Sequence, residues 1–344
     1  MHNSVTLLTS GGIDSAIAAH VLKESGYNVR CVYLKMHELN QEQTQKKAEN
    51  VASFFHLPFS VIDLRTTFAN RVIDALTFNY RKGITPNPCV VCNPEIKFGK
   101  EINRYISSSK GSLIASGHYA QIGECKEENH FSIFKALDQK KDQSYFMYRI
   151  DPKIYSKMLL PIGIYTKEQV KKIARKIGFE EKSFEKESTD LCFYKGSYKD
   201  FARENIHCKP GNILDEKGKI LGKHNGISQY TIGQRQGLGI SSEKPLYVKR
   251  INPQTNEIVL APRENMFRST FIVQSNVWNL LKKDDLSKKI HVKIRYRSPE
   301  LLCNIEKTDD AVIVKLENPA FAITPGQSAV FYIGDRMIGG GIIA

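Results

Sequence analysis

The stretch VTLLTSGGIDSAIAAHVL, residues 5–22, decides the fold of the first half of the chain. Its apolar run from Val5 to Leu8 is typical of a buried strand, and Ile17 and Val21 then recur at helical spacing. Residues 10–15 lie between the two patterns, where glycine N–H groups and the start of a helix can hold an anion. The stretch therefore predicts a strand, an anion-binding loop and a helix.

Strands and helices continue to alternate beyond this unit. Buried strands are predicted at Val29–Leu34, Phe59–Leu64 and Leu113–Ala115. A helical stretch from about Gln41 carries apolar residues on one face, namely Ala48, Val51, Ala52 and Phe55. Alternation of this kind implies right-handed crossovers between parallel strands, with helices on both faces of the sheet. The fold class is thus α/β, with a doubly wound, Rossmann-like N-terminal domain.

The pattern changes from about Gly211, where short alternating segments are separated by turns. Charged and apolar residues alternate over 291–297, and two further apolar runs follow at 311–316 and 328–333. These features predict a β-rich tail that ends in a barrel. We predict three domains: an α/β catalytic domain at 1–205, a small β-rich central domain at 206–265 and a C-terminal antiparallel β-barrel at 266–344.

Composition narrows the class of protein. The chain has 344 residues, 41% hydrophobic and 25% charged, which is the range of folded globular proteins. No window of about 18 apolar residues or secretory leader is visible, so we expect a cytoplasmic protein with no membrane partner. The formal net charge of +14 favours a polyanion such as nucleic acid as partner, and the seven irregularly spaced cysteines do not form a disulfide framework.

The loop SGGIDS, residues 10–15, lacks the Lys of a Walker loop and the third Gly of a dinucleotide fingerprint. It resembles instead the SGGxDS signature of the PP-loop ATP pyrophosphatases, which adenylate a carbonyl oxygen and release pyrophosphate. This resemblance implies that the loop binds ATP. Asp14 can hold Mg²⁺ between the phosphates, or it can be a charge that stabilises the first turn of the helix.

Three cysteines occur in sequence motifs that suggest a chemical role. TPNPCVVCN, residues 85–93, is a rigid loop because its two prolines restrict the backbone. Cys89 and Cys92 within it suit half of a metal site or a redox pair, and Cys192 is a third candidate. A closed zinc site needs four ligands, and the sequence shows no second Cys-x-x-Cys or His pair to complete one.

The whole chain is similar to the family of tRNA-specific 2-thiouridylases. Besides the two loops above, the strings that carry the resemblance are ASGHY at 115–119, KDQSYF at 141–146, YTIGQRQGLGI at 230–240 and ITPGQSAVFY at 323–332. The resemblance implies an enzyme, an ATP-dependent tRNA-uridine 2-sulfurtransferase acting on the wobble uridine. ATP would adenylate the C2 oxygen with release of pyrophosphate, and a cysteine persulfide would supply the sulfur.

The resemblance also implies roles for individual residues. Cys92 would be the nucleophile and Cys192 the persulfide carrier, and the two would close a disulfide when sulfur leaves. The nucleotide would contact the main chain of Leu34, Gly117 with His118, and the loop residues Leu8, Thr9, Ser10, Gly11, Gly12, Ile13, Asp14 and Ser15. The target base would lie beside Asn87, Pro88 and Cys89. The tRNA would contact Lys141, Asp142, Gln143, Arg295 and Tyr296. Apart from the resemblance, we expect Lys97 and Arg235 to add phosphate contacts. Expected partners are the anticodon stem-loop of tRNA and a sulfur-donor or sulfur-relay protein.

Alternatives remain open at this stage. Cys89 stands where one version of the family pattern has an Asp that serves as general base. Its extra thiol allows Cys89, Cys92 and Cys192 to hold an iron–sulfur cluster that delivers hydrosulfide, in place of a persulfide relay. Another PP-loop tRNA-modifying ligase and a non-catalytic tRNA-binding module are further readings, although neither needs the paired cysteines.

Overall fold

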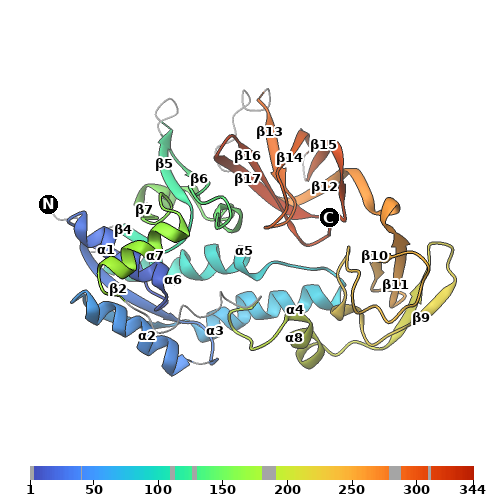
Figure 1. The fold of residues 1–344 in the computed structure, drawn as a ribbon, viewed down its shortest axis with the longest axis horizontal. Helices are drawn as coiled ribbons and strands as arrows, with labels where there is room; N and C mark the ends of the chain where they lie inside the picture. Colours follow the sequence, from blue (N-terminus) through green and yellow to red (C-terminus); the bar gives the residue numbers. More distant parts are fainter. Residues whose placement is uncertain are drawn as a thin grey trace. The chain divides into compact units, whose positions relative to one another are not determined.

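The computed structural model describes residues 4–39, 41–108, 113–125, 130–179, 191–278, 288–308 and 311–344 (Figure 1). The chain divides into two compact units. Unit 1 comprises Met1–Val72, Cys89–Glu187 and Asp335–Ile338, and unit 2 comprises Ile73–Pro88, Ser188–Gly334 and Gly339–Ala344. No helix in the described ranges is long and apolar enough to cross a membrane.

Unit 1 is built on a parallel sheet of five strands in the order β3-β2-β1-β4-β7. The strands are β1 (Ser4–Leu8), β2 (Asn28–Lys35), β3 (Phe59–Asp63), β4 (Leu113–Ser116) and β7 (Met158–Leu159). β1 lies at the centre and pairs in parallel with β2 on one side and β4 on the other. The predicted parallel α/β sheet is confirmed.

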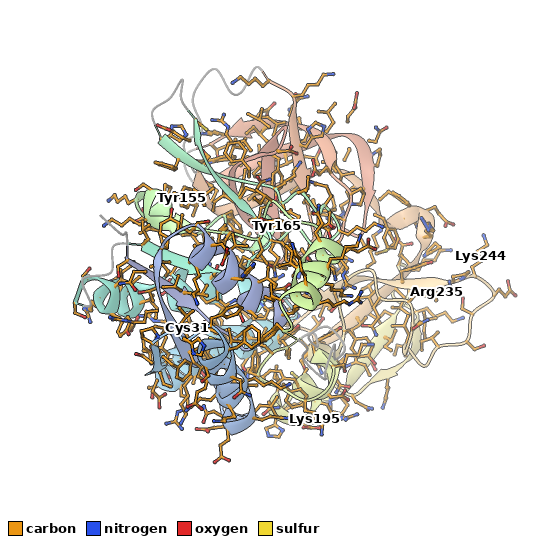
Figure 2. The ribbon with its side chains drawn as sticks, turned by 60° about the vertical axis from the view of Figure 1, so that its left-hand side comes forward. Cys31, Tyr155, Tyr165, Lys195, Arg235 and Lys244 are labelled. Carbon is orange, nitrogen blue, oxygen red and sulfur yellow. The ribbon has the colours of Figure 1, made fainter. Side chains whose placement is uncertain are left out.

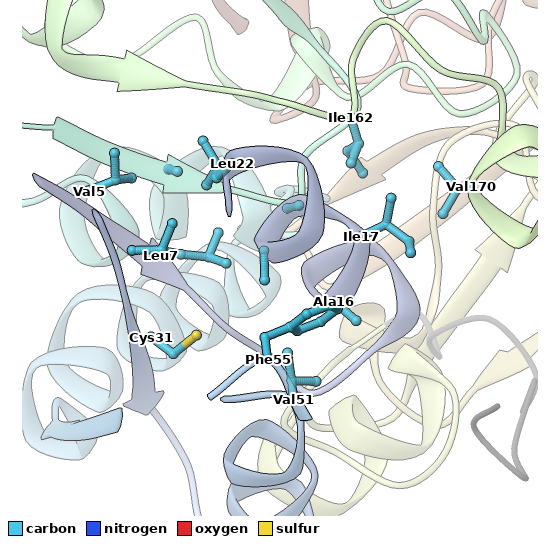
Figure 3. Packing of buried hydrophobic residues seen from close by; sticks show 14 of the residues in the cluster. Val5, Leu7, Ala16, Ile17, Leu22, Cys31, Val51, Phe55, Ile162 and Val170 are labelled. Atoms are coloured by element: carbon cyan, nitrogen blue, oxygen red, sulfur yellow. The ribbon is translucent and has the colours of Figure 1, made fainter. Parts of the chain in front are cut away.

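Three helices cover the face of the sheet formed by Val5, Leu7 and Cys31. They are α1 (Ile13–Glu24), α2 (Gln41–Phe54) and α7 (Lys167–Lys176). Cys31 of β2 is fully buried beneath them (Figures 2 and 3), so this thiol is a small apolar core residue. Burial raises the pKa of the Cys31 thiol, which keeps it protonated.

The remaining elements of unit 1 are shorter. They are α3 (Arg65–Phe68), η1 (Ala69–Ile73), α5 (Pro88–Cys92), η2 (Asn93–Lys97), α6 (Lys100–Ser108), β5 (Gln121–Cys125), β6 (His130–Phe134), η4 (Ser144–Phe146) and η5 (Pro152–Lys157). β5 and β6 form an antiparallel hairpin. One expectation is wrong: β3 was predicted as a buried strand, but it lies at the edge of the sheet and Val61 is 40% exposed. An edge strand has only one neighbour, so an apolar run does not guarantee burial.

Unit 2 is mostly β structure. A four-stranded sheet has the order β10-β11-β8-β9 and consists of β8 (Gly211–Leu214), β9 (Ile220–His224), β10 (Leu246–Asn252) and β11 (Glu257–Pro262). The other strands are β12 (Phe267–Trp278), β13 (Ile290–Lys293), β14 (Leu301–Lys307), β15 (Ala311–Phe321), β16 (Ser328–Ile333) and β17 (Arg336–Ile343). β12 pairs antiparallel with both β15 and β17, which closes these six strands into the predicted barrel.

The helical elements of unit 2 are α4 (Asp74–Arg81), α8 (Tyr198–Asn205), η6 (Ile227–Gln229) and η7 (Arg263–Met266). Charged and apolar residues alternate over 291–297, but β13 ends at Lys293 and a turn begins there. In this turn Ser298 N donates to Arg295 O, and Ser298 Oγ also contacts Arg295 O at 2.9 Å. The domain boundaries at 205/206 and 265/266 stay predictions.

We predict that alanine is tolerated at one of the two loop glycines and not at the other. Gly11 has φ +85°, and a Cβ there would lie 2.6 Å from Lys47 Cβ, so Gly11→Ala should destabilise unit 1 by about 2 kcal/mol or more. Gly12 has φ −82°, and a Cβ there would meet only Ser10 Oγ, at an ordinary contact distance of 3.7 Å, so Gly12→Ala should change the stability by less than about 0.5 kcal/mol. Urea denaturation of both variants checks this. Equal losses would contradict the loop geometry.

Candidate active site

The SGGIDS loop follows β1, the strand at which the strand order of the sheet reverses. From β1 the chain continues to β2 and β3 on one side and returns to β4 on the other side. The loops that follow β1 and β4 therefore part at the carboxyl ends of adjacent parallel strands. This crevice is where open α/β sheets bind their ligands.

The start of α1 presents main-chain donors to this crevice. The Gly12 N-cap makes no side-chain capping bond, and Ala16 N donates to Gly12 O at 3.1 Å. The N–H groups before Ala16 precede the first such bond, so they face the loop with the positive end of the helix dipole. Ser15 Oγ donates to Gly12 O at 2.8 Å and fixes the turn. These main-chain donors form an anion cradle that suits a phosphate group.

The residues that follow β4, beginning with Gly117, form the opposite wall of the crevice. A Cβ on Gly117 would lie 2.9 Å from the carbonyl carbon of Asp14 and 3.0 Å from Ser15 N. The chain can approach the start of α1 this closely only because residue 117 has no side chain. Gly117 therefore sets the width of the crevice beside the loop.

The main chain of Leu34 is available on the open side of β2. β1 ends at Leu8, which pairs with Val32, and Thr9 N donates to Val32 O at 2.9 Å. Alternate residues of a strand direct their N–H and C=O groups to the same neighbour, so Leu34 faces the β1 side like Val32. β1 has no residue opposite Leu34. Its amide and carbonyl can therefore meet the edge of a base.

Asp14 forms an ion pair with Lys167, a residue that is distant in the sequence but belongs to the same unit. Lys167 Nζ lies 2.7 Å from Oδ1 and 2.8 Å from Oδ2 of Asp14, and Tyr119 OH donates to Oδ1 at 2.8 Å. Lys167 is the first residue of α7 and is mostly buried. Sequence reasoning missed it, because a contact across 153 residues leaves no local pattern. The fold thus supplies the cation that the loop sequence lacks.

His118 is buried and paired on both ring nitrogens. Ser116 Oγ lies 2.7 Å from Nδ1, and Lys97 Nζ lies 3.2 Å from Nε2. Burial, and then the Lys97 ammonium, hold the pKa of His118 well below its ordinary value. The ring is therefore neutral, accepts from Lys97 at Nε2 and donates to Ser116 from Nδ1. Lys97, predicted as a phosphate contact, is directed to this ring.

The paired cysteines lie on the single short helix α5. Cys89 and Cys92 are three residues apart, so both side chains leave the same side of the helical turn. Cys92 is buried and Cys89 is exposed. Desolvation by the surrounding protein nevertheless raises the pKa of the Cys89 thiol, against the opposing effect of the Lys97 ammonium. Cys192 is exposed and belongs to unit 2, where its neighbour Leu191 is a core residue.

Two of the predicted tRNA contacts hold their own loop. Asp142 is buried and accepts from Ala136 N at 3.0 Å, Ser144 N at 3.2 Å and Ser144 Oγ at 2.8 Å. Gln143 Oε1 accepts from Tyr119 N at 2.9 Å. The Asp142 carboxylate therefore holds the segment after β6, and Gln143 positions the loop after β4. Three further predicted contacts are half-buried, namely Lys141 of unit 1 and Asn87 and Pro88 of unit 2.

Arg295 is also directed into the protein. Its Nη2 donates to Ile232 O at 3.0 Å, to Ala322 O at 2.7 Å and to Thr324 Oγ1. These bonds join the barrel to the loop after η6, all within unit 2. Tyr296, predicted with it, is half-buried.

Comparison with known proteins assigns the chain to a family. Residues 3–196 match the tRNA methyl transferase HUP domain, 199–262 the tRNA methyl transferase PRC-barrel domain and 268–343 the aminomethyltransferase beta-barrel domain. The chain is 40% identical to tRNA-specific 2-thiouridylase MnmA of Syntrophomonas wolfei over 98% of its length and 99% of that protein. It belongs to the MnmA family. The relatives from Dehalococcoides mccartyi (37% identical, 98% of this chain and 96% of that protein) and Clostridium tetani (39%, 100% and 97%) agree with the MnmA assignment.

Proposed function

We propose that the chain is an ATP-dependent tRNA-uridine 2-sulfurtransferase that thiolates the wobble uridine. The observation that carries the proposal is the anion cradle at the start of α1, in an MnmA-family chain that also carries Cys89 and Cys92 on α5. A lysidine-type ligase needs neither thiol, so the cysteines favour sulfur chemistry over another PP-loop reaction. The net charge of +14 supports a tRNA substrate, since each neutralised phosphate releases counterions.

ATP would place its phosphates on the main-chain donors at the start of α1 and its base edge on the main chain of Leu34. Lys167 would then turn from Asp14 to the phosphates, because both oxygens of Asp14 are occupied while the two residues are paired. Asp14 is the loop carboxylate that can hold Mg²⁺ once Lys167 has left it, and the bound ion would neutralise charge on the triphosphate.

The first chemical step would make the C2 oxygen of uridine a leaving group. That oxygen attacks the α-phosphorus of ATP, the bond to the β-phosphate oxygen breaks, and pyrophosphate departs. Charge grows on the leaving pyrophosphate during this step, so main-chain N–H groups and the Lys167 ammonium near it would lower the barrier. The target base must leave its stack to be reached.

The second step would deliver sulfur from Cys192. The outer sulfur of a Cys192 persulfide attacks C2, AMP leaves, and the base stays attached through a disulfide. Cys92 thiolate then attacks Cys192 Sγ, which releases 2-thiouridine and leaves a Cys92–Cys192 disulfide for a cellular reductant. A sulfur-donor or sulfur-relay protein must renew the persulfide. This partner, the tRNA choice and the cytoplasmic location stay predictions.

An iron–sulfur cluster on Cys89, Cys92 and Cys192 is the second candidate for the sulfur step. The exposed thiol of Cys89 on the same side of α5 as Cys92 favours it. Within the described residues, however, no group of three His, Cys, Asp or Glu side chains could hold a metal ion. The relay and the cluster make opposite predictions for Cys89 and for iron content, which separates the two proposals.

Lys167→Ala should slow tRNA-dependent pyrophosphate release about 100-fold, because a cation that stabilises the transition state is lost. Lys172→Ala is the matched control, since Lys172 is an exposed lysine on the same helix, and it should change the rate less than about twofold. Coupled pyrophosphate assays at saturating ATP measure both variants. Equal rates for the two variants would remove Lys167 from the mechanism.

Cys92→Ser and Cys192→Ser should each abolish 2-thiouridine formation but retain pyrophosphate release, because adenylation needs no thiol. Cys125→Ser is the control, as Cys125 is a half-buried residue of β5 outside these strings. Mass spectrometry of digested tRNA, with a persulfide donor present, provides the readout. Full thiolation by Cys192→Ser would contradict the relay.

The relay predicts that anaerobically purified protein is colourless, lacks iron and acid-labile sulfide, and thiolates tRNA from a persulfide donor. Cys89→Ser should then retain most of the activity. Stoichiometric iron and sulfide, lost together with activity in Cys89→Ser, would establish the cluster in place of the relay.

A further inference from the structure

A cavity of about 480 Å³ opens on the PRC-barrel part of unit 2, and none of its lining residues is used in the proposed chemistry. Its lining includes Arg235 and Lys244, two glycines and two serine residues, Ser241 and Ser242. Figure 2 shows Arg235 and Lys244 at the same outer edge of this part of the chain. The cavity therefore has cationic and hydroxyl-bearing walls.

The floor of the cavity is held in place by one buried side chain. Leu238 is 8% exposed and packs in the core cluster that contains Ile213 and Val248. Gly237 and Gly239 on either side have φ of +71° and +68°, which lets the chain dip to bury Leu238 and return to the surface. The exposed backbone of this turn is thus fixed before any ligand arrives.

Three cations gather at this turn. Arg235 and Lys244 are exposed, and Lys199 Nζ of α8 lies 3.7 Å from where a Cβ would stand on Gly237. Among the described residues, no carboxylate forms an ion pair with any of the three. In the same part of unit 2, Lys249 contacts Glu216 at 2.5 Å and Arg203 contacts Asp200 at 3.0 Å.

We propose that this cavity binds a backbone phosphate of tRNA. The inference rests on the proposed function, which supplies the RNA. Unpaired cations around exposed main-chain groups suit a phosphodiester, and serine hydroxyls suit the adjacent 2′-hydroxyl. Contacts of this kind position an RNA without reading its sequence. The site would thus contribute affinity and leave base selection to unit 1.

The test measures tRNA affinity against KCl concentration for wild-type protein and three double variants. Arg235→Ala with Lys244→Ala should weaken binding about tenfold at low salt and reduce the slope of log K against log salt by about 1. Arg235→Lys with Lys244→Arg retains both charges and should retain most of the affinity. Lys217→Ala with Lys219→Ala removes two exposed cations that do not line the cavity and is the matched control. Thermal unfolding confirms that each variant is folded.

A reduced slope confined to the cavity variant supports the site. An unchanged slope in that variant, or the same reduction in the control, would overturn it, because the charges would then act without a defined contact. If wild-type protein binds no tRNA, the proposed function fails together with this inference. If it binds tRNA and the cavity variant has the wild-type slope, only the cavity assignment fails.

Discussion

The parallel pairing of β1 with β2 on one side and β4 on the other is the constraint on which the candidate site depends. It brings the loop after β1 and the loop after β4 to one edge of the sheet, so that Gly117 meets the start of α1. It also leaves the main chain of Leu34 without a partner strand on the β1 side. One pairing thereby creates the anion cradle, its wall and an open edge of β2 at Leu34.

The charged side chains of this crevice already have partners before any substrate binds. The helix dipole and Lys167 are positive, Asp14 is negative, and His118 is kept neutral by burial beside Lys97. An arriving triphosphate would therefore compete with Asp14 for Lys167 and would gain no cationic charge from His118. This exchange couples nucleotide binding to the release of a carboxylate that suits Mg²⁺. Sulfur chemistry on Cys92 and Cys192 would be separate from it, on other segments of the chain.

The sequence predicted those features that local patterns determine. Apolar periodicity located β1, α1, β2 and α2, and the SGGIDS string located the cradle. Features that depend on distant partners could not be predicted. Lys167 acts through an ion pair across the unit, β3 lies at an edge despite its apolar run, and Arg295 turns inward because β13 ends early. Asp142 resembled a tRNA contact in sequence, but its carboxylate accepts three bonds from its own loop.

Isotope tracing tests the central claim, adenylation of the uridine C2 oxygen, most directly. A tRNA anticodon stem-loop is synthesised with ¹⁸O at C2 of the wobble uridine and incubated with the protein, ATP and a persulfide donor. Mass spectrometry of the products should find one ¹⁸O in each AMP and none in pyrophosphate. Label that appears in water or inorganic phosphate, with unlabelled AMP, would contradict the account.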